Sequence, residues 1–205
     1  IDVAFGDVTA LVKSFADDGK YVELYADYAK SVSVGLISLA GVVCGVVGTN
    51  HAENEGRLTS AAARKAAKFI SFCDCFQLPV ITLVDSEGFA VSGEEEKNPF
   101  CAEIGKLAGT YAMARTPLIT LVCGAVYGSV FSVLGSKSIG ADIVFATENA
   151  KISCMNAKSA VALLWNDQID KDTTRGDLEA KWDAEVATAV SAARAGEIDD
   201  IIESV

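Results

Sequence analysis

Apolar and polar positions along the chain repeat one pattern twice, an amphipathic helix followed by a short apolar strand. Residues 60–76 have apolar positions spaced for one face of a helix, and a proline then leads into the apolar run 80–84. Residues 102–114 and 118–122 form a second helix and strand with another proline between them. The stripe of the first helix consists of Ala66, Phe69, Ile70, Cys73 and Phe76.

Shorter segments on both sides of these two units complete the pattern. Helices are expected at 7–16, within 127–136 (YGSVFSVLGS) and at 177–194, and strands at 21–25, 32–38, 42–48, 143–146 and 151–155. Strands that alternate with helices at this spacing predict an α/β fold with much parallel pairing. Because linkers and low-complexity tracts are absent, residues 1–205 are predicted to form a single domain.

Both apolar strands lead into turns that contain glycine, at VDSEGF (84–89) and YGSVF (127–131). The first amides of a helix have no intrahelical partner, so the N–H groups of Ser129 and Val130 are candidate donors. Gly88 lets the main chain approach a ligand closely and could add a third amide. Converging amides form an oxyanion hole, which stabilises negative charge that develops on a carbonyl oxygen. A glycine turn before a helix capped by solvent is the alternative.

Charge and cysteine content narrow the classes of function. The net charge of −11 disfavours nucleic acid as a partner. Six cysteines, mostly in apolar runs, suit a reducing cytoplasm, and further ligands for a metal site are not found. The uncharged stretches 31–50 and 116–136 are interpreted as buried strands rather than membrane spans. The chain begins with Ile1 rather than Met, so it is interpreted either as an excised piece or as part of a longer polypeptide, and whether an N-terminal domain precedes Ile1 is left open.

Several polar residues are given modest roles. Of Asp85 and Glu87, one is expected to hydrogen-bond the loop and the other to lie at the mouth of the site. The acidic run 94–96 is expected to be a solvated loop face, and His51 an exposed loop residue. Trp165 and Trp182 are interpreted as packing residues.

Five segments resemble the C-terminal domain of biotin-dependent acyl-CoA carboxyltransferases, the β-subunit type of propionyl-CoA carboxylase and transcarboxylase. They are DDGKYVELYADYAKSVSVGLISLAGVVCGVV, SAAARKAAKFISFCDCFQLPVITLVDSEGF, VYGSVFSVLGSKSIGADIVFAT, AKISCMNAKSA and AGEIDDIIES. They occur in the family's order over residues 7–204, with similar gaps. The resemblance implies a crotonase-like fold, a spiral of ββα units surrounded by helices.

The resemblance also implies a reaction and its partners. Carboxybiotin on a carrier protein or domain gives its carboxyl group to an acyl-CoA, with no metal at the transfer site. A separate N-terminal domain binds the CoA side, so this domain alone is expected to be inactive. Like subunits are expected to assemble into an oligomer through apolar faces. The family's amide donors fall on Gly88, Ser129 and Val130. The surrounding substrate site is expected to include Phe89, Tyr127, Gly128, Phe131 and Ser132.

The chain departs from the family pattern at this site. The family's Arg-Lys-Ala-Tyr-Gly-Gly-Ala-Tyr-Asp corresponds here to GAVYGSVFS (124–132), which lacks the basic pair and the acidic residue beside the acyl pocket. Val130 and Phe131 are expected to narrow a pocket that smaller groups line in the family. The identity of the acyl group is therefore left open.

Two alternatives remain beside carboxyl transfer. Ser129 at a helix start would suit a serine hydrolase of the same fold, but that chemistry needs a general base within hydrogen-bond reach. The lost basic pair and the bulk of Val130 would suit a non-catalytic scaffold or assembly subunit of such a complex.

Overall fold

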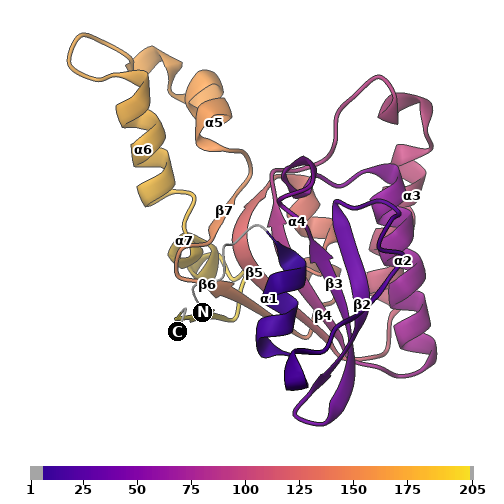
Figure 1. The fold of residues 1–205 in the computed structure, drawn as a ribbon. Helices are drawn as coiled ribbons and strands as arrows, with labels where there is room; N and C mark the ends of the chain where they lie inside the picture. Colours follow the sequence, from indigo (N-terminus) through magenta and orange to yellow (C-terminus); the bar gives the residue numbers. More distant parts are fainter. Residues whose placement is uncertain (1–6, 204–205) are drawn as a thin grey trace.

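A computed structural model describes residues 7–203. One mixed sheet of eight strands runs through it, in the order β1-β2-β3-β4-β5-β6-β8, with β7 beside β5 (Figure 1). The strands are β1 (Val22–Leu24), β2 (Val32–Leu39), β3 (Val42–Thr49), β4 (Val80–Ser86), β5 (Leu118–Tyr127), β6 (Ile143–Thr147), β7 (Lys151–Ser153) and β8 (Asp200–Ile202). β1, β2 and β3 pair antiparallel, and the remaining pairs are parallel.

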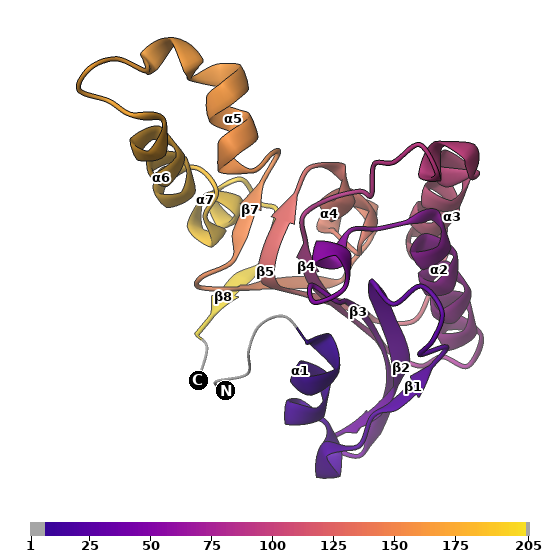
Figure 2. The same cartoon turned by 45° about the horizontal axis from the view of Figure 1, so that its top comes forward.

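Residues 7–203 also form seven α-helices. They are α1 (Val8–Phe15), α2 (Ser60–Cys75), α3 (Phe100–Met113), α4 (Ser129–Val133), α5 (Ala157–Leu164), α6 (Arg175–Glu185) and α7 (Ala189–Arg194). α2 and α3 cover one face of the sheet and α1 lies against the other, while α5 and α6 stand away from the body as an arm (Figures 1 and 2). The α/β prediction with parallel pairing is confirmed. Among residues 7–203, no helix has the length and apolar character that a membrane crossing requires.

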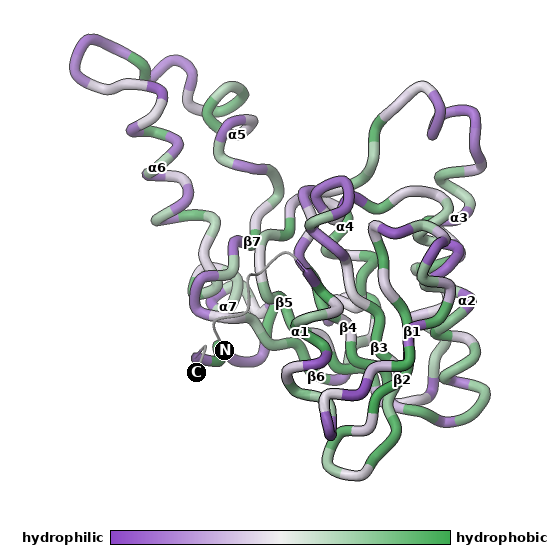
Figure 3. The backbone as a smooth tube through the Cα atoms, in the orientation of Figure 1, coloured by the Kyte–Doolittle hydropathy of each residue, from purple (hydrophilic) through white to green (hydrophobic). Residues whose placement is uncertain are grey.

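The main core lies between the sheet and the helices α2 and α3. Phe69 and Ile70 of α2 and Leu107 of α3 are buried there against the central strands. Burying side chains of this size contributes about 1.5–3 kcal/mol each. β3, β4 and β5 are accordingly among the most hydrophobic stretches, whereas the loop at the end of the arm is hydrophilic (Figure 3). The predicted apolar stripe of α2 is therefore its core face, except that Phe76 is 63% exposed.

The start of α2 corrects one expectation from the sequence. Thr59 caps the helix by accepting the amide hydrogen bond of Ala62. Glu95 is half-buried, and its carboxylate accepts the amide hydrogen bond of Ser60 at 2.9 Å. The acidic run at 94–96 is therefore not merely a solvated face, because a carboxylate is stabilised by the free amides of a helix N-terminus.

The predicted helix at 177–194 was wrong as a single element. The chain forms α6 and α7 with a break between them, and Thr188 caps α7 through the amide of Ser191. A side chain that bonds main-chain amides favours a new helix start over continuation of the old one. The prediction also missed α5 and β8. Trp165 and Trp182 pack edge to face in the small core of the arm, with their ring centroids 5.2 Å apart, as expected of packing residues.

All six cysteines are free, but only three are buried. Cys44, Cys73 and Cys123 lie in the interior, where burial raises the pKa of each thiol. Cys75 is exposed, so Cys73 and Cys75 face different ways as the helical spacing predicts.

We expect Tyr111→Phe to lower the free energy of unfolding by about 1–3 kcal/mol. The Tyr111 hydroxyl and Thr82 Oγ1 are 2.9 Å apart, both residues are 1% exposed, and the change leaves the Thr82 hydroxyl without this partner. Urea denaturation measures the loss. Tyr25 is 50% exposed, so Tyr25→Phe should change the free energy of unfolding by less than about 0.5 kcal/mol. Equal losses in the two variants would contradict a stabilising role for the hydrogen bond between Tyr111 and Thr82.

Stability is also expected to fall as the pH rises above about 10. Burial raises the pKa of Tyr111 and of Tyr21 above the ordinary value of 10.0, so the unfolded chain loses these phenol protons before the folded one does. The contribution of these two phenols to the free energy of unfolding is complete below about pH 10 and is lost as the pH rises further. Urea denaturation on both sides of pH 10 tests the slope, which Tyr111→Phe should reduce.

Candidate functional site

The two strand ends singled out from the sequence lie side by side. β4 and β5 are parallel neighbours, and Ser86 is paired with Val126 near their carboxyl ends. Gly88 has a φ of 122°, and a Cβ on it would lie 3.7 Å from the Tyr127 carbonyl oxygen. The structure therefore brings Gly88 next to the segment that leads into α4.

The turn from β5 into α4 leaves two amides available. Gly128, with φ 70° and ψ −154°, ends the strand, and its N–H donates to the Ser153 carbonyl oxygen at 3.0 Å. Within residues 7–203, the N–H groups of Ser129 and Val130 have no hydrogen-bond acceptor. Since α4 has five residues, these individual amides matter more than a helix dipole.

The Gly88 amide, unlike those of Ser129 and Val130, already has a hydrogen-bond acceptor. It donates to the Ser86 hydroxyl at 3.3 Å, and that hydroxyl in turn donates to the Gly88 carbonyl oxygen at 3.2 Å. A donor–acceptor distance of 3.3 Å lies beyond the usual range for an N–H donor, so the bond is weak. The third predicted donor is therefore partly engaged inside the loop.

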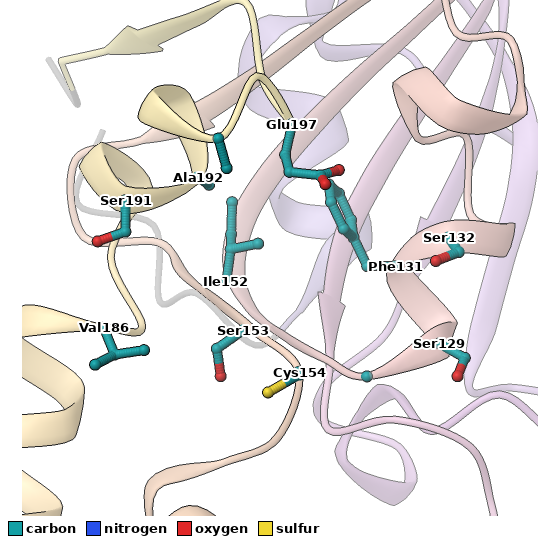
Figure 4. Close-up of a pocket in the computed structure, with 12 residues that line it drawn as sticks. Ser129, Phe131, Ser132, Ile152, Ser153, Cys154, Val186, Ser191, Ala192 and Glu197 are labelled. Atoms are coloured by element: carbon teal, nitrogen blue, oxygen red, sulfur yellow. The ribbon is translucent and has the colours of Figure 1, made fainter.

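A pocket of about 520 Å³ lies beside these amides. Figure 4 shows residues from α4, from β7 and its following turn, and from α7 around it. Its lining is Gly128, Ser129, Phe131, Ser132, Ile152, Ser153, Cys154, Val186, Ser191, Ala192, Ala195 and Glu197. Apolar side chains from three elements thus meet hydroxyl groups and a single carboxylate, Glu197. The pocket combines an apolar wall with polar groups placed at its edge, as small-molecule sites do.

Four of the predicted site residues line this pocket, and four do not. Gly128, Ser129, Phe131 and Ser132 belong to its lining. Gly88, Phe89, Tyr127 and Val130 are not part of the lining. The Val130 side chain is fully buried, and Phe89 packs edge to face on Phe100 at 5.5 Å. Val130 can therefore contribute its main chain, whereas Phe89 supports the loop.

Sequence reasoning missed the far wall of the pocket. Val186 follows the end of α6, Ser191 lies on α7, and Glu197 lies in the turn before β8. The continuous helix expected at 177–194 hid the break that brings Val186 and Ser191 to one cavity. Thr188 followed by Ser191 was the available signal, because a threonine that can bond an amide three residues later marks a helix start.

Tyr127 lies beside the site in acidic surroundings. Burial, followed by the charges of Glu87, Asp183 and Asp85, raises the pKa of Tyr127 to about 12. The phenol therefore stays protonated at neutral pH. The same carboxylates disfavour an anion in this region unless donors point directly at it.

The two carboxylates at the end of β4 have different environments. Asp85 is 9% exposed, and its Oδ1 accepts the Ala125 N–H hydrogen bond at 3.0 Å. Glu87 is half-buried, and its amide donates to the Glu55 carbonyl oxygen. Asp85 thus bonds the neighbouring strand rather than its own loop.

His51 lies less exposed than expected. Its Nδ1 is 3.2 Å from Asp85 Oδ1, and its side chain is 35% exposed. This makes it a half-buried neighbour of the strand ends and corrects the expectation of an exposed loop residue. Among residues 7–203, neither His51 nor another base hydrogen-bonds the Ser129 hydroxyl, so this geometry does not favour a serine hydrolase.

Comparisons with known proteins agree with the resemblance found in the sequence. Residues 3–204 match the carboxyl transferase domain family. The propionyl-CoA carboxylase carboxyltransferase subunit of Haloferax mediterranei is 33% identical over 201 residues, covering 96% of this chain and 39% of that protein. A putative propionyl-CoA carboxylase beta chain of Bacillus subtilis is 34% identical over 200 residues, with the same two coverages.

Solved structures give the same result for the fold. A crystal structure of transcarboxylase 12S, described as a hexamer with hydrolysed methylmalonyl-CoA bound, superposes with a TM-score of 0.92 at 30% identity. That match covers 98% of this chain and 40% of the other. The Pseudomonas aeruginosa geranyl-CoA carboxylase beta subunit gives a TM-score of 0.83 at 25% identity, covering 96% and 38%. These neighbours are crotonase-like carboxyltransferases, which confirms the predicted fold class.

The chain spans about two fifths of the length of these relatives. Within that span the match extends over almost every residue, in sequence and in structure. The protein therefore belongs to the carboxyl transferase domain family.

Proposed function

We propose that this domain forms the biotin side of an acyl-CoA carboxyltransferase. The observation that supports this most directly is the pair of unbonded amides at Ser129 and Val130, which stand at the edge of a pocket. When bound, carboxybiotin supplies an activated carboxyl group for transfer to an acyl-CoA. The two amides would donate to the ureido oxygen and stabilise negative charge as it develops there.

The residues present fit such a group because two free amides lie in surroundings that are otherwise acidic. A permanent anion would be repelled by Glu87, Asp183 and Asp85, the carboxylates that act on Tyr127. Carboxybiotin carries a negative charge on its carboxyl group, and that charge would move to the ureido oxygen as the carboxyl group departs, so two amides at that oxygen would offset the repulsion where the charge develops. Backbone donors also explain how Ser129 and Val130 can stand where the family has Gly and Ala.

We infer the partners from the relatives, which are carboxyltransferase subunits of biotin-dependent carboxylases and transcarboxylase. A carrier protein or domain would bring biotin, and a second carboxyltransferase half of similar fold would bring the acyl-CoA. Transcarboxylase 12S is described as a hexamer, and we propose an oligomer of like subunits here also. The six free cysteines fit a reducing compartment such as the cytoplasm. A non-catalytic scaffold is the competing proposal, since the basic pair of the family is lost.

Ser129→Pro is expected to lower carboxyl transfer by about 10²–10³-fold, because it removes one amide donor. Ser129 is the first residue of α4, a position where proline is tolerated. Transfer from carboxybiotin is measured in the complex of this chain with the acyl-CoA-side half and a biotinylated carrier. Ser129→Ala, which keeps the amide, should lose far less. Equal rates for wild type and Ser129→Pro would support the scaffold instead.

Ser86→Ala tests whether the Gly88 amide belongs to the site. The change removes the hydroxyl that holds this amide at 3.3 Å, so the amide becomes free. If Gly88 is a third donor, transfer in the same complex should rise above the wild-type rate, and an unchanged rate at unchanged stability would contradict that role. A large loss of transfer with unchanged stability would instead show that Ser86 itself is needed at the site.

A further inference from the structure

The ladder between β4 and β5 changes register close to the site. Val84 is paired with Val122, but the next pair is Ser86 with Val126. β4 thus advances by two residues while β5 advances by four, so β5 holds two extra residues at this point. An insertion of this kind bends the strand that contains it and redirects the residues that follow.

The bend coincides with a change of partner. β5 is paired with β6 up to Val122, which lies opposite Ala146. From Ala125 to Tyr127 it is paired with β7 instead. The redirected residues lead straight into Gly128 and the amides of α4, so the direction of the bend determines where those amides point.

The Asp85 carboxylate fills the space that the bend creates. A Cβ on Gly124 would lie between 2.3 and 2.6 Å from its three carboxylate atoms, so only glycine leaves room for them. Its Oδ1 accepts the Ala125 N–H at 3.0 Å, which replaces a ladder bond that the register shift removes. The carboxylate is therefore bonded to the first residue of the redirected segment.

Other elements hold Asp85 from the opposite side. The Thr49 hydroxyl accepts its N–H at 2.7 Å and donates to its carbonyl oxygen at 2.9 Å. His51 Nδ1 lies 3.2 Å from Oδ1 but makes no hydrogen bond within residues 7–203, so it is a neighbour of the carboxylate rather than a support. Gly56, with a φ of 64°, packs so closely that a Cβ there would lie 2.2 Å from the Asp85 carbonyl oxygen. β3 and the loop after it thus hold Asp85 in place, and Asp85 in turn holds the bend in β5.

We propose that Asp85 is a positioning residue for carboxyl transfer, which acts by holding the bent end of β5 so that the Ser129 and Val130 amides face the pocket. A buried carboxylate is costly unless it is bonded, and here its bonds go to the segment that leads to those amides. The inference rests on the proposed function, because it assigns Asp85 a role in the same site.

Asp85→Ala is expected to lower kcat for transfer by about 10²-fold, since a small displacement of donors has an effect of that size. The KM for acyl-CoA should change little, because the partner half binds it. Asp85→Asn, which keeps an oxygen for the Ala125 amide, should recover much of the rate. Asp142→Ala is the matched control, because that carboxylate accepts the Leu118 N–H at 2.8 Å at the other end of β5. Asp142→Ala should lower the free energy of unfolding but leave the rate of carboxyl transfer unchanged.

A measurement on this chain alone separates the two proposals. In amide NMR spectra, Asp85→Ala should shift the resonances of residues 125–130, whereas Asp142→Ala should leave them in place. Gly124→Ala, which displaces the carboxylate, should act like Asp85→Ala and serves if that variant does not fold. Unmoved resonances, or equal losses of transfer in Asp85→Ala and Asp142→Ala, would overturn the positioning role. An inactive wild-type complex would instead refute the proposed function, while the resonances would still decide the role of Asp85.

Discussion

The rest of the site depends on the point where β5 changes partner. Its first half is buried in a parallel sheet, where every main-chain group is needed for the ladder. Beyond Gly124 the strand bends away to β7, and the space it vacates is filled by the Asp85 carboxylate. This bend moves the end of β5 away from β6, so that α4, β7 and α7 can enclose a pocket.

Charge sets a second condition on the site. The chain has a net charge of −11, and three carboxylates act on Tyr127 beside the amides. In such surroundings, negative charge on a ligand is stabilised only where hydrogen-bond donors point directly at it. Main-chain N–H groups are suited to that situation because they are fixed by the fold and do not reorganise as charge develops. In the proposed site, these main-chain donors would take the place of the basic pair that the family pattern has.

The C-terminal part of the chain shapes the pocket as much as the strand ends do. α5 and α6 form an arm with its own small core, so they can stand away from the sheet (Figure 2). The break after α6 then returns the chain to the sheet through α7 and β8, which brings Val186 and Glu197 into the lining of the pocket together with Phe131 (Figure 4). The shape of the pocket is therefore decided jointly by α4 and by this returning segment.

The class of fold, the main helices and strands, and the two glycine turns could be predicted from the amino-acid sequence, because periodicity and turn chemistry depend on residues that are neighbours in the chain. The sequence did not reveal that β5 continues to Tyr127, that α6 and α7 are separate, or that Asp85 bonds Ala125. Those features arise between residues far apart in the chain, through a register shift and a change of strand partner. Only the tertiary structure could decide them, since pairing between strands depends on which segments meet in space.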